Sequence, residues 1–191
     1  MKIARLLLLV FTCIFINKVN AQAGYIITQK NDTIKGEVKM RAFGRPQFKP
    51  SNKADFKPIV LDTLKEYQLK DSSIWVTKRL PTTSMNFISK PQFVQLLETG
   101  KINLYQQTGT DRYRLRTWYV AQTPDSLIAI KTDDIFLAGG GGKKGRQEIL
   151  SNMFADQPDV QAAFNATGKF DFDTIRLYIH KYNQGTAATS K

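Results

Sequence analysis

The sequence predicts a mainly β fold of the α+β class, with an antiparallel barrel-like or sandwich-like sheet followed by about three short helices. Three observations lead to this prediction. Apolar and polar residues alternate from Gly24 onward, and short apolar runs follow one another with turn residues, but no helical segments, between them. After four consecutive glycines at residues 139–142, the apolar residues recur at helical spacing instead.

Residues 1–21 have the three parts of a secretory signal peptide. Lys2 and Arg5 supply positive charge, residues 6–16 are dominated by apolar side chains, and residues 19–21 end in a small-residue cleavage site at Ala21. The apolar run is shorter than the roughly 20 residues needed to span a bilayer. We therefore expect an exported chain, cleaved after Ala21 or Ala23; a retained anchor or a buried N-terminal helix is the alternative.

Net charge and cysteine content indicate the kind of surface and the covalent links to expect in the mature protein. The formal net charge is +12, and the signal peptide holds three basic residues and no acid, which leaves +9 on the mature chain. Such a surface should attract polyanions. Cys13, the only cysteine, lies inside the signal peptide, so we expect no thiol, disulfide or lipid anchor in the mature chain. No later segment is long and apolar enough to be expected to span a membrane.

Residues 24–138 are predicted to form the antiparallel β domain. Residues 25–29 and 33–40 make its first hairpin, around the turn residues Lys30, Asn31 and Asp32. Residues 41–55 are predicted to be a loop with one short strand. The remaining strand candidates are 59–61, 64–69, 73–80, 93–97, 102–106, 112–121 and 127–131, of which 93–97 also fits a helical turn.

A glycine-rich linker is expected at residues 139–145, followed by a helical appendage at 146–183. Apolar residues recur at helical spacing from Ile149 to Phe154, and Pro158 stands where a second helix would begin. Asp171 is the expected N-cap of the last helix. Residues 184–191 are small and polar, which predicts a frayed tail.

The strongest candidate site is a row of arginines in the strand at 112–121. Alternate side chains of a strand point to the same face, so Arg112, Arg114 and Arg116 should lie about 7 Å apart with Trp118 next in line. Tyr113, Leu115 and Tyr119 should then point toward the core. Guanidinium groups followed by an indole would suit a polyanion, by paired hydrogen bonds and stacking. The alternative is a solvated strand face without a ligand.

A second basic group follows the glycines. Lys143, Lys144 and Arg146 would suit a phosphate at a helix N-terminus, or would be solvated charges on a flexible link. The same segment matches G-x-G-x-x-G, but that fingerprint belongs to a parallel βαβ unit, which the alternation before it does not predict. We therefore interpret the glycines as a linker, and we expect no cofactor.

No motif identifies a reaction. His180 is the only histidine and has no cysteine or second histidine to share a metal, so no metal site is expected. A nucleophile elbow of the G-x-S-x-G type is absent from the sequence. Two carboxylates that meet only in the folded chain would still make a hydrolase, and this leaves a carboxylate-pair enzyme as an alternative.

Several short segments carry a resemblance to a known group. Residues 24–28 and 32–38 (GYIIT and DTIKGEV), residues 100–105 (GKINLY), and the tail from Arg146 to Asn183 are similar to uncharacterised exported proteins of Bacteroidota. The resemblance implies localisation in the cell envelope or outside the cell, and it implies no activity. This chain departs from the group at Gln157, where the group has cysteine.

The same lineage implies candidate O-glycosylation sites. Asp followed by Ser or Thr and an apolar residue resembles the acceptor sequence of that phylum, although these dipeptides are also common in turns and helix caps. The four hydroxyl residues in that context are Thr33, Thr63, Ser126 and Thr174.

Taken together, these observations favour an exported, non-enzymatic binding or interaction module with a basic face. Its expected partner is an envelope protein or an anionic glycan or lipid surface in the periplasm, at the cell envelope or outside the cell. Specific nucleic-acid recognition would rest on charge alone, because the sequence carries no nucleic-acid-binding motif. The alternative is a hydrolase of envelope polymers that uses a carboxylate pair.

Overall fold

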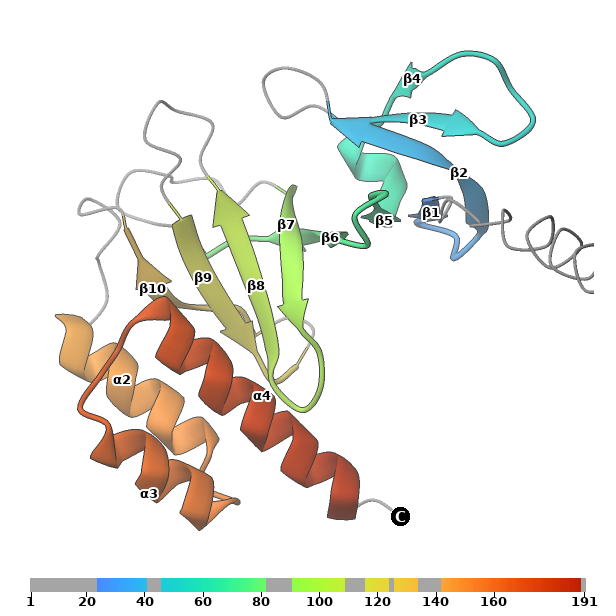
Figure 1. Ribbon diagram of the computed structural model, residues 1–191. Helices are drawn as coiled ribbons and strands as arrows, with labels where there is room; N and C mark the ends of the chain where they lie inside the picture. The colour runs from blue at the N-terminus through green and yellow to red at the C-terminus, as the bar shows by residue number, and fades with distance from the viewer. Residues whose placement is uncertain are drawn as a thin grey trace, which may run out of the picture.

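Ten strands pair into one antiparallel sheet in the order β10-β9-β8-β7-β6-β5-β1-β2-β3-β4, and three helices follow it (Figure 1). The computed structural model describes residues 24–40, 46–81, 91–108, 116–123, 126–133 and 142–189. This confirms the predicted mainly β class with a small helical C-terminal part. The sheet is not closed: β10 and β4 are its two edge strands.

The sheet is almost entirely a meander of neighbouring strands. Only the β1–β5 pairing joins strands that are not consecutive. The strands are β1 (Tyr25–Thr28), β2 (Thr33–Met40), β3 (Pro46–Pro50), β4 (Lys57–Pro58), β5 (Leu64–Gln68), β6 (Ile74–Arg79), β7 (Pro91–Glu98), β8 (Asn103–Thr108), β9 (Arg116–Ala121) and β10 (Ile128–Thr132). A 3-10 helix, η2 (Leu61–Thr63), precedes β5, and the helices are α2 (Gly142–Met153), α3 (Pro158–Ala166) and α4 (Phe172–Thr189).

Most predicted strands are present, and one is wrong. The β1–β2 hairpin turns at Asn31 with φ of 68°, a backbone that asparagine tolerates. The strand predicted at residues 59–61 does not form. The backbone N–H and the hydroxyl of Thr63 both donate to the Val60 carbonyl, which folds this segment into η2 rather than extending it.

The helical part begins earlier and ends later than expected. Helix α2 starts at Gly142, so the described end of the predicted linker is its first turn; residues 139–141 lie outside the described ranges. Asp171 caps α4 as predicted, because its Oδ1 accepts from the Thr174 N–H at 2.8 Å. The helix continues to Thr189, through most of the tail that was expected to fray.

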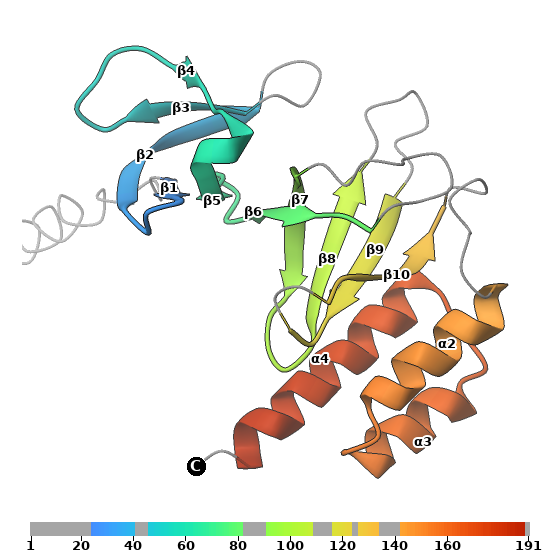
Figure 2. The ribbon, with the colours of Figure 1, turned by 180° about the vertical axis from the view of Figure 1, so that it is seen from behind.

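The larger core lies between the helices and one face of the sheet's C-terminal strands. Both views show α2, α3 and α4 together on that side of the sheet (Figures 1 and 2). Leu104, Val120 and Ile130 from the strands are fully buried against the helices. On the opposite face of β7–β9 a second cluster forms around Val94, Tyr105 and Tyr119. Strands β8 and β9 are therefore covered on both faces.

A smaller core stands at the other end of the sheet, away from the helices (Figure 2). It is built from residues of β1, β2, β3 and β5: Ile26, Val38, Phe48, Leu64 and Tyr67. Gly36 lets β2 approach β3 closely, because a Cβ at this position would overlap the Phe48 ring. Only one face of β2 and β3 is covered by this core, which leaves the other face to solvent.

Candidate functional site

The predicted arginine row is only partly within the described residues. Arg112, Tyr113, Arg114 and Leu115 lie outside them. Arg116, the first residue of β9, is exposed and engaged by its neighbours. Its Nε lies 3.1 Å from Asp133 Oδ2, and its guanidinium carbon is 4.3 Å from the centroid of the Phe172 ring on α4. Its charge is therefore partly neutralised.

The position of Trp118 differs from the predicted one, which was an exposed side chain next to the arginines. Its side chain is only 4% exposed, and its ring packs edge-on against Phe172 at 4.7 Å between centroids. The indole N–H donates to Gln106 Oε1 at 2.8 Å. The expectation of an exposed indole beside the arginines is wrong, because α4 covers the face of β9 that Trp118 occupies. Tyr119 is buried as predicted, on the other face.

The second predicted basic group lies on a helix rather than on a flexible link. Lys143 and Lys144 are exposed in the first turn of α2, and Arg146 is half-buried in the next. The structure therefore places two of the three predicted cations in solvent. Among the described residues, Arg116 contacts Asp133 and Phe172 rather than these cations.

The four candidate glycosylation residues differ in accessibility. Thr33, Thr63 and Ser126 are exposed, whereas Thr174 is half-buried in the first turn of α4. Their modification stays a prediction.

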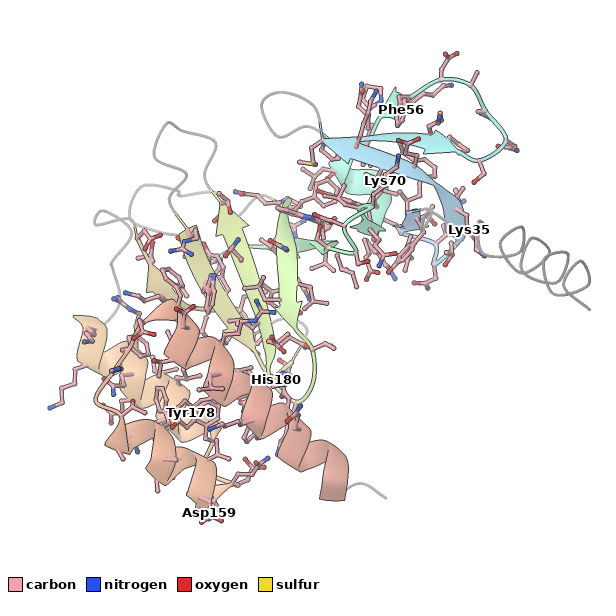
Figure 3. All side chains as sticks on the ribbon, viewed as in Figure 1. Lys35, Phe56, Lys70, Asp159, Tyr178 and His180 are labelled. Carbon is pink, nitrogen blue, oxygen red and sulfur yellow. The ribbon has the colours of Figure 1, made fainter. Side chains whose placement is uncertain are left out.

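A cluster of described cations lies on β2 and β3, and the sequence analysis did not single it out. We call it the lysine face: Lys35 and Lys39 of β2, Lys49 of β3, Lys70 after β5, and the Glu37 and Phe56 side chains between them. Lys35, Glu37 and Lys39 alternate with the core residues Gly36 and Val38, so they share the uncovered side of β2. Figure 3 shows Lys35, Phe56 and Lys70 in this part of the molecule, away from the helices.

Glu37 and Phe56 organise the lysine face. Glu37 accepts from Lys70 at 2.6 Å and lies 3.4 Å from Lys49. The hydrogen bond from Lys70, reinforced by Lys49, holds the pKa of the Glu37 carboxyl below its usual range. The Lys39 and Lys49 ammonium groups lie 3.7 Å and 5.0 Å from the centroid of the Phe56 ring. Lys39, Lys49 and Lys70 thus contact the Glu37 carboxylate or the Phe56 ring, and Lys35 lies two residues from Glu37 on the same face of β2.

The charge of the chain is concentrated in the same region. Residues 24–81 contain twelve lysines and arginines against six acids, whereas residues 91–189 contain eleven against ten. Comparing the charge of these two segments would have pointed to β2–β5 rather than to β9. The signal was present in the sequence, but the strand pairing was needed to bring Lys49 and Lys70 beside β2.

His180 takes part in a contact between α4 and the β7–β8 hairpin. Glu98, at the end of β7, accepts from Arg176 Nε at 2.7 Å and pairs with His180 Nδ1 at 3.0 Å. Burial opposes ionisation of Glu98, but the hydrogen bonds from Arg176 and His180 outweigh it and lower the pKa of the carboxyl. The second ring nitrogen of His180 lies 2.8 Å from the Gln184 amide. Both ring nitrogens are therefore engaged in holding the helix.

Residues that carry the sequence resemblance complete this contact, which we call the α4 clasp. Asn183 Nδ2 donates to the Ile102 carbonyl at 2.8 Å, and the Ile102 N–H donates to Asn183 Oδ1 at 3.0 Å. Gly100 is required here, because a Cβ would overlap Asn183. Lys101 pairs with Asp156, which also accepts from the Tyr182 hydroxyl at 2.7 Å. Residues 100–102 thus lie against Asp156, Tyr182 and Asn183, and these contacts join the β7–β8 hairpin to the helices.

Five described carboxyl groups have a pKa below the ordinary range. Besides Glu98, hydrogen bonds hold the pKa of four groups below the usual range: Glu37 beside Lys70, Asp71 beside Ser73, Asp156 beside Lys101, and Asp171 beside the Thr174 amide. A carboxylic acid that donates a proton near neutral pH needs a raised pKa instead. These five groups are therefore ionised under such conditions.

Comparisons of the chain with models of protein families, with curated protein sequences and with solved structures return no match. Within the described ranges, no three or more histidine, cysteine or acidic side chains are grouped to hold a metal ion. No helix in those ranges combines the length and the apolar character needed to cross a membrane. Inference about function therefore starts from the lysine face and the contacts around it.

Asn183 should be the main polar residue of the α4 clasp. Asn183→Ala removes both partners of the Ile102 peptide groups and should lower the free energy of unfolding by about 1–3 kcal/mol. Urea denaturation measures the change. Asn165→Ala, the same change at an exposed position of α3, is the control and should change stability by about 0.5 kcal/mol or less. Equal effects of the two variants would contradict a specific role for Asn183.

Glu98 should make the clasp sensitive to acid. Its folded-state pKa lies below the ordinary value of 4.5, so its stabilising contribution is complete above that pH and is lost as the pH falls through the folded value. Glu98→Gln should therefore cost about 1 kcal/mol at pH 7, since Arg176 and His180 are both half-exposed.

Urea midpoints measured from pH 7 down to pH 3 test this prediction. The gap between the parent protein and Glu98→Gln should close as the pH falls below 4.5. Glu148→Gln, an exposed change of the same charge on α2, is the control and should give a smaller gap than Glu98→Gln at pH 7. A Glu98→Gln gap that persists in acid would argue against the ion-pair contribution.

Proposed function

We propose that the mature chain is an exported binding protein that holds an anionic polymer on the lysine face of β2 and β3. The observation that carries this proposal is the cluster of Lys35, Lys39 and Lys49 on one side of β2 and β3, which no other helix or strand of the described ranges covers. The polymer is an acidic glycan or another repeating polyanion of the cell envelope.

The spacing of the lysines supports an extended ligand. Alternate residues of a strand lie about 7 Å apart, so Lys35 and Lys39 are separated by twice that distance along β2. Lys49 lies across the strand pair from Glu37 and widens the positive surface. A polymer with regularly spaced charges would meet several ammonium groups at once, whereas a small anion would meet one or two.

Phe56 gives the face an apolar component. Its ring is half-buried and contacts the ammonium groups of Lys39 and Lys49. The ring would therefore lie next to the anionic groups of a polymer bound to these lysines. Sugar rings present apolar C–H surfaces as well as charges, and an aromatic ring between lysines suits both. This favours an acidic glycan over a polymer of inorganic phosphate.

A carboxylate-pair hydrolase is the alternative, and the electrostatics of the described residues favour binding. The carboxyl at the centre of the lysine face, Glu37, is ionised and engaged by two lysines. Its role there is to position Lys49 and Lys70. A proton-donating acid would need surroundings that raise its pKa.

Replacing three lysines tests the proposal directly. K35Q/K39Q/K49Q keeps the Lys70–Glu37 pair and should weaken binding to heparin, as a model acidic glycan, by about tenfold at low salt. The slope of log affinity against log salt should also flatten, because fewer counterions are released. Fluorescence anisotropy with a labelled oligosaccharide measures both quantities.

The control variant has the same change in charge on the helices. K143Q/K144Q/K181Q removes three exposed cations from α2 and α4 and should leave most of the affinity intact. The circular dichroism of both variants should match the parent protein, because exposed substitutions change stability little. A helix triple that weakens binding as much as the sheet triple would move the site away from β2 and β3.

Export is a separate prediction. Cleavage after Ala21 or Ala23 would leave β1, which starts at Tyr25, intact. N-terminal sequencing of protein recovered from the periplasm or medium should therefore start at Gln22 or Gly24. Mass spectrometry of the same sample would also reveal any glycan on the chain. An intact Met1 on a membrane-bound product would overturn the signal-peptide assignment.

A further inference from the structure

A small apolar pocket opens on the side of β3 opposite the lysine face. Its volume is about 180 Å³. Phe48 lines the pocket, whereas its neighbour Lys49 belongs to the lysine face, because successive side chains of a strand point to opposite faces. The floor is completed by Ile26 and Leu64, which are 7% and 4% exposed. The pocket therefore reaches the smaller core, which is formed by β1, β2, β3 and β5.

The walls of the pocket leave apolar surface in water. Pro58, Ile59 and Val60 form the wall on the side of β4 and η2. Val60 is 59% exposed, although it is a large aliphatic residue next to a core. The hydrogen bonds from Thr63 to the Val60 carbonyl fix this wall. Covering such surface with an apolar group is favourable in proportion to the area removed from water.

The charges in the described lining are both positive. They belong to Lys53, in the β3–β4 loop, and Lys57, in β4. Among the described residues, neither ammonium group makes an ion pair or a side-chain hydrogen bond, whereas Lys49 and Lys70 on the opposite side are paired with Glu37. The pocket thus combines an apolar interior with two cations that have no protein anion to neutralise them.

We propose that this pocket binds a free medium-chain carboxylate, with the aliphatic tail on Ile26, Phe48 and Leu64 and the carboxylate beside Lys53 and Lys57. A pocket of about 180 Å³ suits one short aliphatic chain rather than the two chains of a membrane lipid. The binding of this ligand is independent of the anionic polymer proposed for the lysine face.

Octanoate is the probe for the test, with methyl-labelled full-length mature protein observed by NMR. Octanoate should shift the methyl signals of Ile26, Val60 and Leu64, while those of Ile175 and Ile179 in the helical core stay in place. Affinity should rise about fourfold per added methylene from butanoate to octanoate. Octan-1-ol, which has no charge, should bind at least about fivefold more weakly than octanoate.

Paired lysine variants separate a specific site from general attraction. K53A/K57A should weaken octanoate binding about fivefold or more, whereas K39A/K49A, with the same loss of charge on the opposite side of β3, should leave it nearly unchanged. All four lysines are at least partly exposed, so both variants should keep the parent melting temperature within a few degrees.

Three outcomes would overturn the proposal. The first is an equal loss of octanoate affinity in both lysine variants, and the second is equal affinity for octanoate and octan-1-ol. The third is tighter binding of dihexanoylphosphatidate, a soluble lipid with two short chains, which would assign the pocket to membrane lipid instead. Binding of heparin to the lysine face is measured separately, so failure of one proposal leaves the other intact.

Discussion

The coverage of β8 and β9 on both faces is the constraint on which the rest of the fold depends. Leu104 and Val120 face the helices, and Tyr105 and Tyr119 face the second cluster on the other side of the sheet. An open sheet has two faces to cover: α2, α3 and α4 cover one face of these strands, and the side chains of the second cluster bury the other. The α4 clasp then fixes the helices at one end, where Asn183 completes the hydrogen bonds of Ile102.

This constraint separates the two ends of the sheet into different environments. The end with the helices is nearly neutral, and Arg116, Lys101 and Arg176 are held there in ion pairs with acids. The end formed by β1–β5 has a core on one face only, so its other face is free to carry charge. The lysine face and the apolar pocket lie on opposite sides of β3. The strands β1–β5 therefore present two chemically different surfaces.

The segments that carry the sequence resemblance are structural in this molecule. Gly36 permits the contact of β2 with Phe48, Gly100 permits the contact with Asn183, and Asp156 joins Lys101 to Tyr182. Each short segment supplies one side of a close approach between elements that are distant in sequence.

The sequence by itself determined the elements of this protein, because strand and helix periods are local properties. The β1–β2 hairpin, the strands β5–β8 and β10, and the Asp171 cap follow from neighbouring residues. The sequence could not decide which face of β9 is covered. Trp118 and Tyr119 are both aromatic and point to opposite faces; the docking of α4 buries Trp118, and the second cluster buries Tyr119. The lysine face and the pocket were likewise decided by tertiary structure, since they depend on strand pairing and on the fold of η2 against β3.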